Sequence, residues 1–162
     1  MILDEIDLKI LEILQKNGRT RRSDLASMVG LSIPAASERM RKLEDDGYIT
    51  GYFALLDPQK LGKGLTAFVL VTVDSSKHYP TFIEHVKPVD EIMECHSITG
   101  EGTHLIKIRC EDTLALEKLL ARIQVWPGVV KTTTNVVLSP IKESLHVKIP
   151  KAQLAKVEHQ QR

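Results

Sequence analysis

The sequence has few of the features that would place a 162-residue chain in a membrane or outside the cell. No apolar run approaches the roughly 20 residues that a membrane-spanning helix requires. Two cysteines, Cys95 and Cys110, are too few for a disulfide framework and favour a reducing compartment. The acidic, helix-patterned start Met1–Glu5 is unlike a signal peptide. We therefore expect a cytoplasmic protein that has no membrane partner.

The sequence also lacks the local motifs of common catalytic and metal sites. It has no nucleophile elbow and no glycine-rich loop that would cradle a phosphate. Its six histidines show none of the close spacings typical of metal ligands. Cys95 and His96 are adjacent on an expected strand and would face opposite sides, while Cys110 is expected in the core. We therefore expect neither an enzyme nor a bound metal or cofactor.

The charge is distributed unevenly, although its net value is only +1. Residues 16–42 contain seven basic and two acidic side chains, which gives this segment a charge of +5. Overall, 43% hydrophobic and 27% charged residues exclude a disordered or collagen-like chain. The basic segment indicates either a site for a polyanion or an ordinary solvated helical surface.

The first 50 residues have the pattern of three short helices. These helices are expected at 4–17, 22–29 and 33–46. Asp4 and Ser32 are suitable N-caps, and Pro34 suits a first turn, where its missing N–H costs nothing. In the first helix, Leu8 lies about 160° from Ile10 around the helix axis. We therefore expect Leu8 to point away from the core, towards a partner subunit.

The rest of the chain alternates between strand and helix patterns. Residues 48–56 are strand-like, and the proline and glycines of 57–64 predict a hinge. Further elements are expected at 65–73 (strand), 79–87 (helix), 91–99 and 104–110 (strands), 113–124 (helix) and 129–138 (strand). This β-α-β-β-α-β order is typical of a ferredoxin-like domain. A short strand at 144–149 and a helix at 151–159 complete the prediction.

A helix-turn-helix pattern lies within the three helices. The motif needs a small residue in the helix before the turn, a glycine at the turn and apolar residues behind the helix that reads the DNA. Ala26, Gly30, Leu31 and Ala36 supply these. Arg21 and Arg22 lie at the start of the second helix, where the helix dipole disfavours positive charge. A phosphate docked there would make their positive charge favourable. The predicted DNA contacts are Arg21, Arg22, Ser32, Pro34, Ala35, Ser37, Glu38, Arg41 and Lys42. The alternative is a three-helix packing module whose third helix is only solvated.

Short motifs along the chain follow the order of a known family of regulators. The N-terminal motifs are Leu3–Leu11, Gly18-Arg19, Asp24–Ala26, Val29–Ser32, Glu38–Glu44, Gly47–Ile49 and Gly51-Tyr52. The C-terminal motifs are Asp57-Pro58, Leu61-Gly62, Thr99–Glu101 and Trp126–Val130. In this order, over roughly residues 3–140, the sequence resembles the Lrp/AsnC (feast/famine) transcriptional regulators.

The resemblance implies an α+β fold, in which an N-terminal winged helix-turn-helix domain is joined to a C-terminal ferredoxin-like βαββαβ domain. It divides the chain into a DNA-binding domain (1–50), a connecting strand and hinge (51–64), an effector-binding and oligomerisation domain (65–143) and a C-terminal tail (144–162). Family members form homodimers that often assemble into octamers, and they respond to amino acids.

The resemblance also implies a site for the small effector. The corresponding residues here are Thr99, Gly100, Glu101, Gly102, Thr103 and His104 in one loop, with Thr132 and Thr134 on a facing strand. Members usually carry two acids in this loop, whereas this chain has only Glu101. A buried amino acid needs partners for both its ammonium and its carboxylate. We expect Glu101 to pair with the ammonium, and Thr103 with backbone N–H groups to serve the carboxylate.

These observations together predict a sequence-specific DNA-binding regulator whose assembly or DNA affinity responds to an amino acid. Its expected partners are double-stranded DNA, the effector and further copies of the chain. One alternative is an architectural protein that compacts DNA without an effector. Another is a haem-pathway decarboxylase of similar fold, which the few arginines of the C-terminal half argue against.

Overall fold

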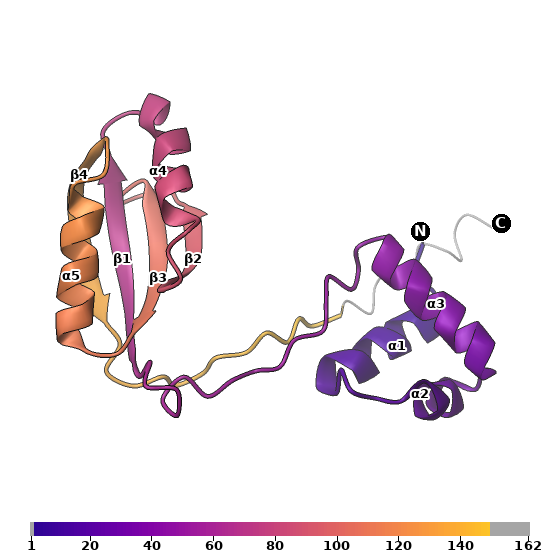
Figure 1. The fold of residues 1–162 in the computed structure, drawn as a ribbon. Helices are drawn as coiled ribbons and strands as arrows, with labels where there is room; N and C mark the ends of the chain where they lie inside the picture. The colour runs from indigo at the N-terminus through magenta and orange to yellow at the C-terminus, as the bar shows by residue number, and fades with distance from the viewer. Residues whose placement is uncertain (1, 150–162) are drawn as a thin grey trace. The chain divides into compact units, whose positions relative to one another are not determined.

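The computed structural model describes residues 2–149, and these form two units with separate hydrophobic cores (Figure 1). One unit contains residues 2–55 together with 143–149, and the other contains residues 56–142. The chain therefore passes from one unit to the other twice. Among the described residues, no helix has the length and apolar character needed to cross a bilayer.

The first unit is built from three helices whose bounds agree with the sequence prediction to within one residue. They are α1 (Glu5–Lys16), α2 (Arg22–Val29) and α3 (Ile33–Asp45). Asp4 caps α1 in a reciprocal capping box with Asp7, and the Ser32 hydroxyl caps α3 by accepting from Ala35 N–H. Gly30 ends α2 with a φ of 72°, a left-handed conformation that glycine adopts without strain. The chain thereby turns sharply from α2 into α3.

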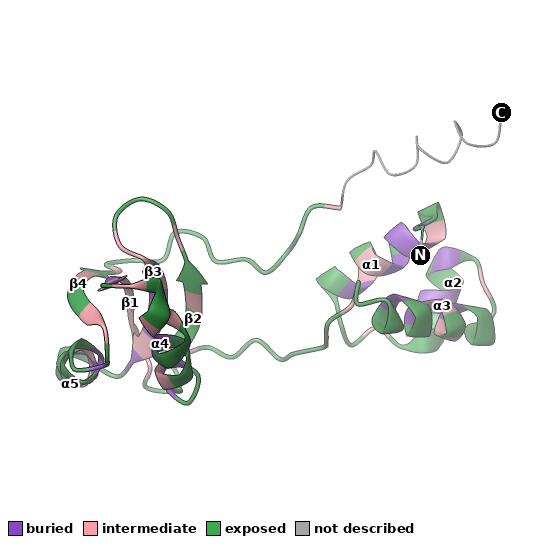
Figure 2. Ribbon diagram, turned by 90° about the horizontal axis from the view of Figure 1, so that it is seen from above, coloured by how far each residue is buried: buried purple, intermediate pink, exposed green. Residues whose placement is uncertain are grey.

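The core of this unit is formed where the buried sides of the three helices meet, coloured purple in Figure 2. Leu25 and Leu43 are fully buried there, as the helical pattern predicts. Leu8 is also buried, with 8% exposure, so the prediction that it faces a partner subunit is wrong. Leu8 belongs to the same buried cluster as Ile10 and Leu14, and residues beyond the helices, Ile49 and Ile149, also pack against that cluster, so the core is wider than one stripe of α1.

The second unit is a four-stranded antiparallel sheet with two helices. Its strands are β1 (Leu65–Val73), β2 (Ile92–Ser97), β3 (His104–Cys110) and β4 (Val129–Val136). Its helical elements are η1 (Ser76–His78), α4 (Tyr79–Val86) and α5 (Thr113–Gln124). The strand order β2-β3-β1-β4 confirms the expected ferredoxin-like domain.

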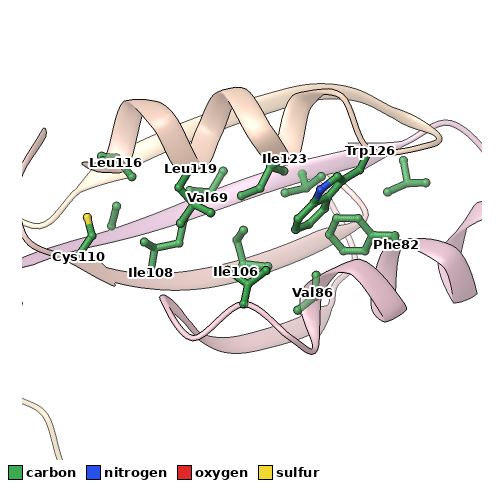
Figure 3. Packing of buried hydrophobic residues seen from close by; sticks show 14 residues of the cluster. Val69, Phe82, Val86, Ile106, Ile108, Cys110, Leu116, Leu119, Ile123 and Trp126 are labelled. Atoms are coloured by element: carbon green, nitrogen blue, oxygen red, sulfur yellow. The ribbon is translucent and has the colours of Figure 1, made fainter. Parts of the chain in front are cut away.

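Both α4 and α5 pack on the same face of the sheet (Figure 3). Alternate residues of β1 and β3, such as Val69 and Ile106, are fully buried on this face. Phe82 from α4 meets Trp126, which follows α5, with ring centroids 5.8 Å apart. The opposite face of the sheet carries the half-buried residues of β1, and neither α4 nor α5 covers it.

Two strand predictions are wrong. No strand forms within 48–56, where the connecting strand is expected, and none forms within 144–149. A strand pattern needs a neighbouring strand to complete its hydrogen-bond ladder, and these segments have none within the described chain. The helix expected at 151–159 lies outside the described residues.

Candidate DNA interface and ligand-binding loop

The exposed face of α3 carries most of the predicted DNA contacts. Pro34, Ala35, Glu38, Arg41 and Lys42 are exposed, and Ser37 is half-buried. The opposite side of the same helix, with Ala36, Met40 and Leu43, is buried against the core. This division follows from helical periodicity, because residues three and four apart share a face. The structure therefore gathers these side chains on one accessible surface.

Carboxylates engage both hydrogen-bonding edges of the Arg41 guanidinium. Its Nε and Nη2 donate to Glu38 Oε2 and Oε1 over 3.1 and 2.8 Å, and its Nη1 donates to Asp45 Oδ2 over 2.7 Å. The hydrogen bond from Arg41 lowers the pKa of Glu38, and the same bond raises the pKa of Arg41. Lys42 Nζ lies 3.8 Å from Glu38 Oε1. The charges of Arg41, Lys42, Glu38 and Asp45 therefore sum to zero, and with the exposed Glu44 this side of α3 has no net positive charge.

The start of α2 adjoins this face. Arg21 occupies the N-cap position, but its side chain makes no capping hydrogen bond, and Arg22 begins the helix. Both side chains are exposed. A shallow hollow between α2 and α3 is lined by Arg22, Pro34, Ser37, Glu38, Met40, Arg41 and Glu44. Arg22 of α2 and the predicted contacts Pro34, Ser37, Glu38 and Arg41 of α3 therefore border one depression.

Arg39 is an important residue of this unit that the sequence reasoning did not single out. Its Nη1 lies 2.6 Å from Asp4 Oδ2 and 2.7 Å from Asp7 Oδ1, so it joins α3 to the start of α1. The Asp7 side chain is only 6% exposed. Burial opposes the ionisation of Asp4, but the Asp7 backbone N–H and Arg39 outweigh it and lower the pKa of Asp4. No local signal marks these partners, which are more than 30 residues apart in sequence.

In the second unit, the predicted effector residues come from the loop between β2 and β3 and from β4. Ile98 N–H donates to the Thr103 carbonyl over 3.1 Å and closes the loop. Gly102 has a φ of 82°, and a Cβ there would lie 3.3 Å from the Val71 carbonyl oxygen. Glycine at this position therefore permits both the turn and the close approach to β1.

The sheet register brings the loop and β4 to either side of the same β1 residues. His104 and Thr132 both pair with Val71, and Thr134 pairs with Val69 two residues further along. The end of the loop and Thr132 are therefore two strand spacings apart, roughly 10 Å. The structure brings these predicted residues to one end of the sheet.

Glu101 has a partner that the sequence reasoning missed. Lys131 Nζ on β4 lies 3.4 Å from Glu101 Oε1, and the two side chains are 62% and 70% exposed. The pair presents one positive and one negative group beside Thr99, Gly100 and Gly102. Sequence separation hides this pair, because the two residues lie 30 positions apart.

Thr103 and His104 are engaged within the fold. The Thr103 hydroxyl donates to the Val71 carbonyl over 3.1 Å and accepts from Val73 N–H over 3.0 Å. His104 Nδ1 lies 2.9 Å from the same hydroxyl. The His104 ring packs against Tyr79 and Phe82, and burial lowers its pKa. The Thr103 hydroxyl proton is therefore donated within the sheet, and the role of Thr103 at a ligand carboxylate stays a prediction.

Comparisons with known proteins match both units. Residues 3–50 match a model described as winged helix-turn-helix DNA-binding, and residues 66–147 match the Lrp/AsnC ligand binding domain. The leucine-responsive regulatory protein of Escherichia coli K12 is 41% identical over 145 residues, covering 88% of each chain.

Solved structures of similar proteins extend the match to the fold. A transcriptional regulator of Neisseria meningitidis, solved as a complex with L-Met, is 32% identical with a TM-score of 0.86, and the match covers 90% of this chain and 96% of that one. Escherichia coli AsnC is 31% identical with a TM-score of 0.83, covering 90% and 98% of the two chains. Both likenesses span the helical unit and the sheet unit.

Proposed function

The chain belongs to the Lrp/AsnC family and is a DNA-binding transcriptional regulator, and we propose that α3 is the element that reads its operator. The observation that carries this proposal is the two-sided character of α3, whose apolar side is buried while Pro34, Glu38 and Arg41 are exposed. In a helix-turn-helix, the N-terminal part of such a helix meets base edges in the major groove. Ser32, Ala35, Ser37 and Lys42 then border the contact.

Arg21 and Arg22 supply contacts to the DNA backbone in this proposal. They lie at the positive end of α2, where backbone N–H groups and arginines together favour a phosphate. Such contacts fix the position of the protein on the duplex without reading sequence. Two copies of the chain then place two α3 helices about one helical turn apart, or a multiple of it.

The proposed effector is a free amino acid, bound at the loop that contains Glu101. An amino acid carries an ammonium and a carboxylate, and Glu101 and Lys131 offer one partner of each charge. The Neisseria relative, solved as a complex with L-Met, supports this class of ligand. Thr99, Gly100 and Gly102 supply backbone groups beside the pair, and Thr132 and Thr134 supply hydroxyls from β4.

Assembly of several copies, as a homodimer that builds an octamer, completes the proposal. The connecting segment exposes Phe53 by 82% and Leu55 by 79%, and Leu138 after β4 is 98% exposed. Large apolar side chains at this exposure favour contact with another chain. Effector binding then shifts the balance between assemblies, because it stabilises whichever one contains the complete site.

The test measures duplex binding and particle mass while amino acids are added one at a time. We expect Arg41→Ala to weaken binding and to reduce the slope of log affinity against log salt, by as much as about 0.9 where the lost contact is to a phosphate. Arg122→Ala, an exposed arginine of α5, is the control. Unchanged affinity and slope for Arg41→Ala would remove α3 from the interface.

The effector site is tested by Glu101→Ala, which we expect to abolish the response to the active amino acid while the protein stays folded. Glu84→Ala is the matched control, because Glu84 forms a similarly exposed ion pair, with Lys87, in the same unit. An unaltered response in Glu101→Ala places the pocket elsewhere. If no amino acid changes affinity or mass, the architectural role without an effector becomes the better description. We propose no catalytic role.

A further inference from the structure

The exposed face of α3 carries no net positive charge, although a basic surface is typical of DNA-binding modules. Arg41 and Lys42 are balanced by Glu38 and Asp45, and all four side chains are at least 49% exposed. A polyanion would gain little from this face, because affinity for phosphates depends on uncompensated positive charge. The general attraction can instead come from the exposed arginines at the start of α2. The acids of α3 therefore need a different explanation.

Glu38 and Asp45 hold Arg41 in different ways. Glu38 forms a two-point fork with Nε and Nη2, whereas Asp45 makes one bond to Nη1, one turn further towards the C-terminal end of α3. The fork is the more directional of the two arrangements. It also fixes the Glu38 carboxylate on the N-terminal half of the exposed face, beside Pro34 and Ala35.

The fork leaves Glu38 able to contact a base. Each carboxylate oxygen has two acceptor positions, and Arg41 takes only one on each oxygen. A carboxylate in the major groove accepts a hydrogen bond from the amino group of cytosine and is repelled by phosphates. Arginine, in turn, pairs with guanine. The two residues together therefore match a C·G pair or two neighbouring pairs that contain both bases.

We propose that Glu38, positioned by Arg41, is a specificity-determining residue that selects cytosine at one operator position and weakens binding to other sequences. This inference rests on the proposed role of α3 as the reader. Sites without that cytosine leave a carboxylate in the groove with no donor, and they meet an arginine whose charge is already cancelled. Glu38 thus lowers affinity for DNA in general and raises the ratio between operator and random sequence.

The experiment selects binding sequences from a library of randomised duplexes, using the full-length protein and two variants. Glu38→Gln and Asp45→Asn each remove one acid that is bonded to Arg41 without changing side-chain size, so each is the matched control of the other. Both should bind a random duplex several-fold more tightly at low salt. Only Glu38→Gln should change the selected sequence. We expect its preferred base to shift from cytosine towards adenine, because an amide recognises adenine by two hydrogen bonds.

The outcomes separate this inference from the proposed function. A wild-type protein that enriches no sequence overturns both. If the wild-type protein enriches an operator and Glu38→Gln enriches the same one, the inference alone is overturned. The inference also fails if Asp45→Asn changes base preference as much as Glu38→Gln does. Unfolding curves of both variants, whose replaced side chains are exposed, check that the fold is intact.

Discussion

Arg39 and Arg41 stand two residues apart on α3, yet their guanidinium groups have different surroundings. Arg39 is 32% exposed and contacts Asp4 and the nearly buried Asp7, whereas Arg41 is 59% exposed and contacts acids of its own helix. Removing one partner of a buried ion pair leaves an uncompensated charge, which costs far more than losing an exposed pair. Arg39 therefore stabilises the packing of α3 on α1, whereas Arg41 contributes little to that packing.

This difference gives a prediction for stability. Arg39→Met should lower the free energy of unfolding of the helical unit by about 1–3 kcal/mol, because Asp7 stays buried without its cation. Arg41→Met, the same change on the same helix, should leave the free energy of unfolding nearly unchanged, because its ion pairs are exposed to solvent. Urea unfolding followed by circular dichroism measures both. Equal effects of the two substitutions would contradict the assignment.

Tyr52 gives a prediction for pH. Its hydroxyl donates to Glu44 Oε1 over 2.9 Å, and burial, together with this bond and the Glu44 charge, raises the pKa of Tyr52 to about 12. The folded protein therefore holds this proton more tightly than the unfolded chain, in which the pKa of tyrosine is about 10. The resulting stabilisation is complete below about pH 10 and is lost as the pH rises towards 12.

The phenolate absorbance of wild-type protein minus that of Tyr52→Phe reports this group directly. We expect a midpoint near pH 12 in the wild type and a lower one in Glu44→Gln, which loses the negative charge beside the phenol. Tyr52→Phe should also lose less stability than the wild type between about pH 10 and 12. A wild-type midpoint near the ordinary tyrosine value would disprove the contact with Glu44.

At the scale of elements, the segment 143–149 belongs to the helical unit although it follows the whole sheet unit in sequence. The Gln15 side chain on α1 donates to the Val147 carbonyl over 3.0 Å and accepts from Val147 N–H over 2.7 Å. Ile149 packs against the core of the same unit. A side-chain amide thus provides the backbone partners that a neighbouring strand would otherwise give.

Gln15→Ala should release this segment. We expect the Val147 amide to exchange hydrogen faster, because its acceptor on Gln15 is lost, while stability changes by about 1 kcal/mol or less at this exposed site. Glu12→Ala, an exposed change on the same helix, is the control. Equal exchange at Val147 in wild type and Gln15→Ala would show that the contact does not hold the segment in solution.

At the scale of the whole molecule, two separate cores support the two units. Phe82 lies in the core of the sheet unit with 0% exposure, and Arg39 belongs to the helical unit. We therefore expect two transitions in calorimetric unfolding. Phe82→Ala should lower the free energy of unfolding of the sheet unit by about 3–5 kcal/mol and shift only its transition. Arg39→Met should shift only the transition of the helical unit. If either substitution shifts both transitions equally, the units do not unfold separately.

Local patterns in the sequence were enough to predict most of the elements. Asp4, Ser32 and Gly30 fix the ends of helices through capping contacts within a few residues, and the alternation along 65–73 and 104–110 fixes which side chains are buried. His104, the first residue of β3 and expected at the effector loop, follows this alternation and is buried. Short-range geometry of the backbone decides these features, so they can be read without the tertiary structure.

The sequence by itself determined the order of the elements, the family and the exposed face of α3. Only the tertiary structure decided that Leu8 is buried, that 48–56 has no strand partner within the described chain, and that Arg39 joins Asp4 and Asp7. The tertiary structure also revealed the ion pair between Lys131 and Glu101 and the hydrogen bonds between the Gln15 side chain and the Val147 backbone. Each of these depends on which distant elements meet, and such meetings arise from the packing of whole faces rather than from local backbone preferences.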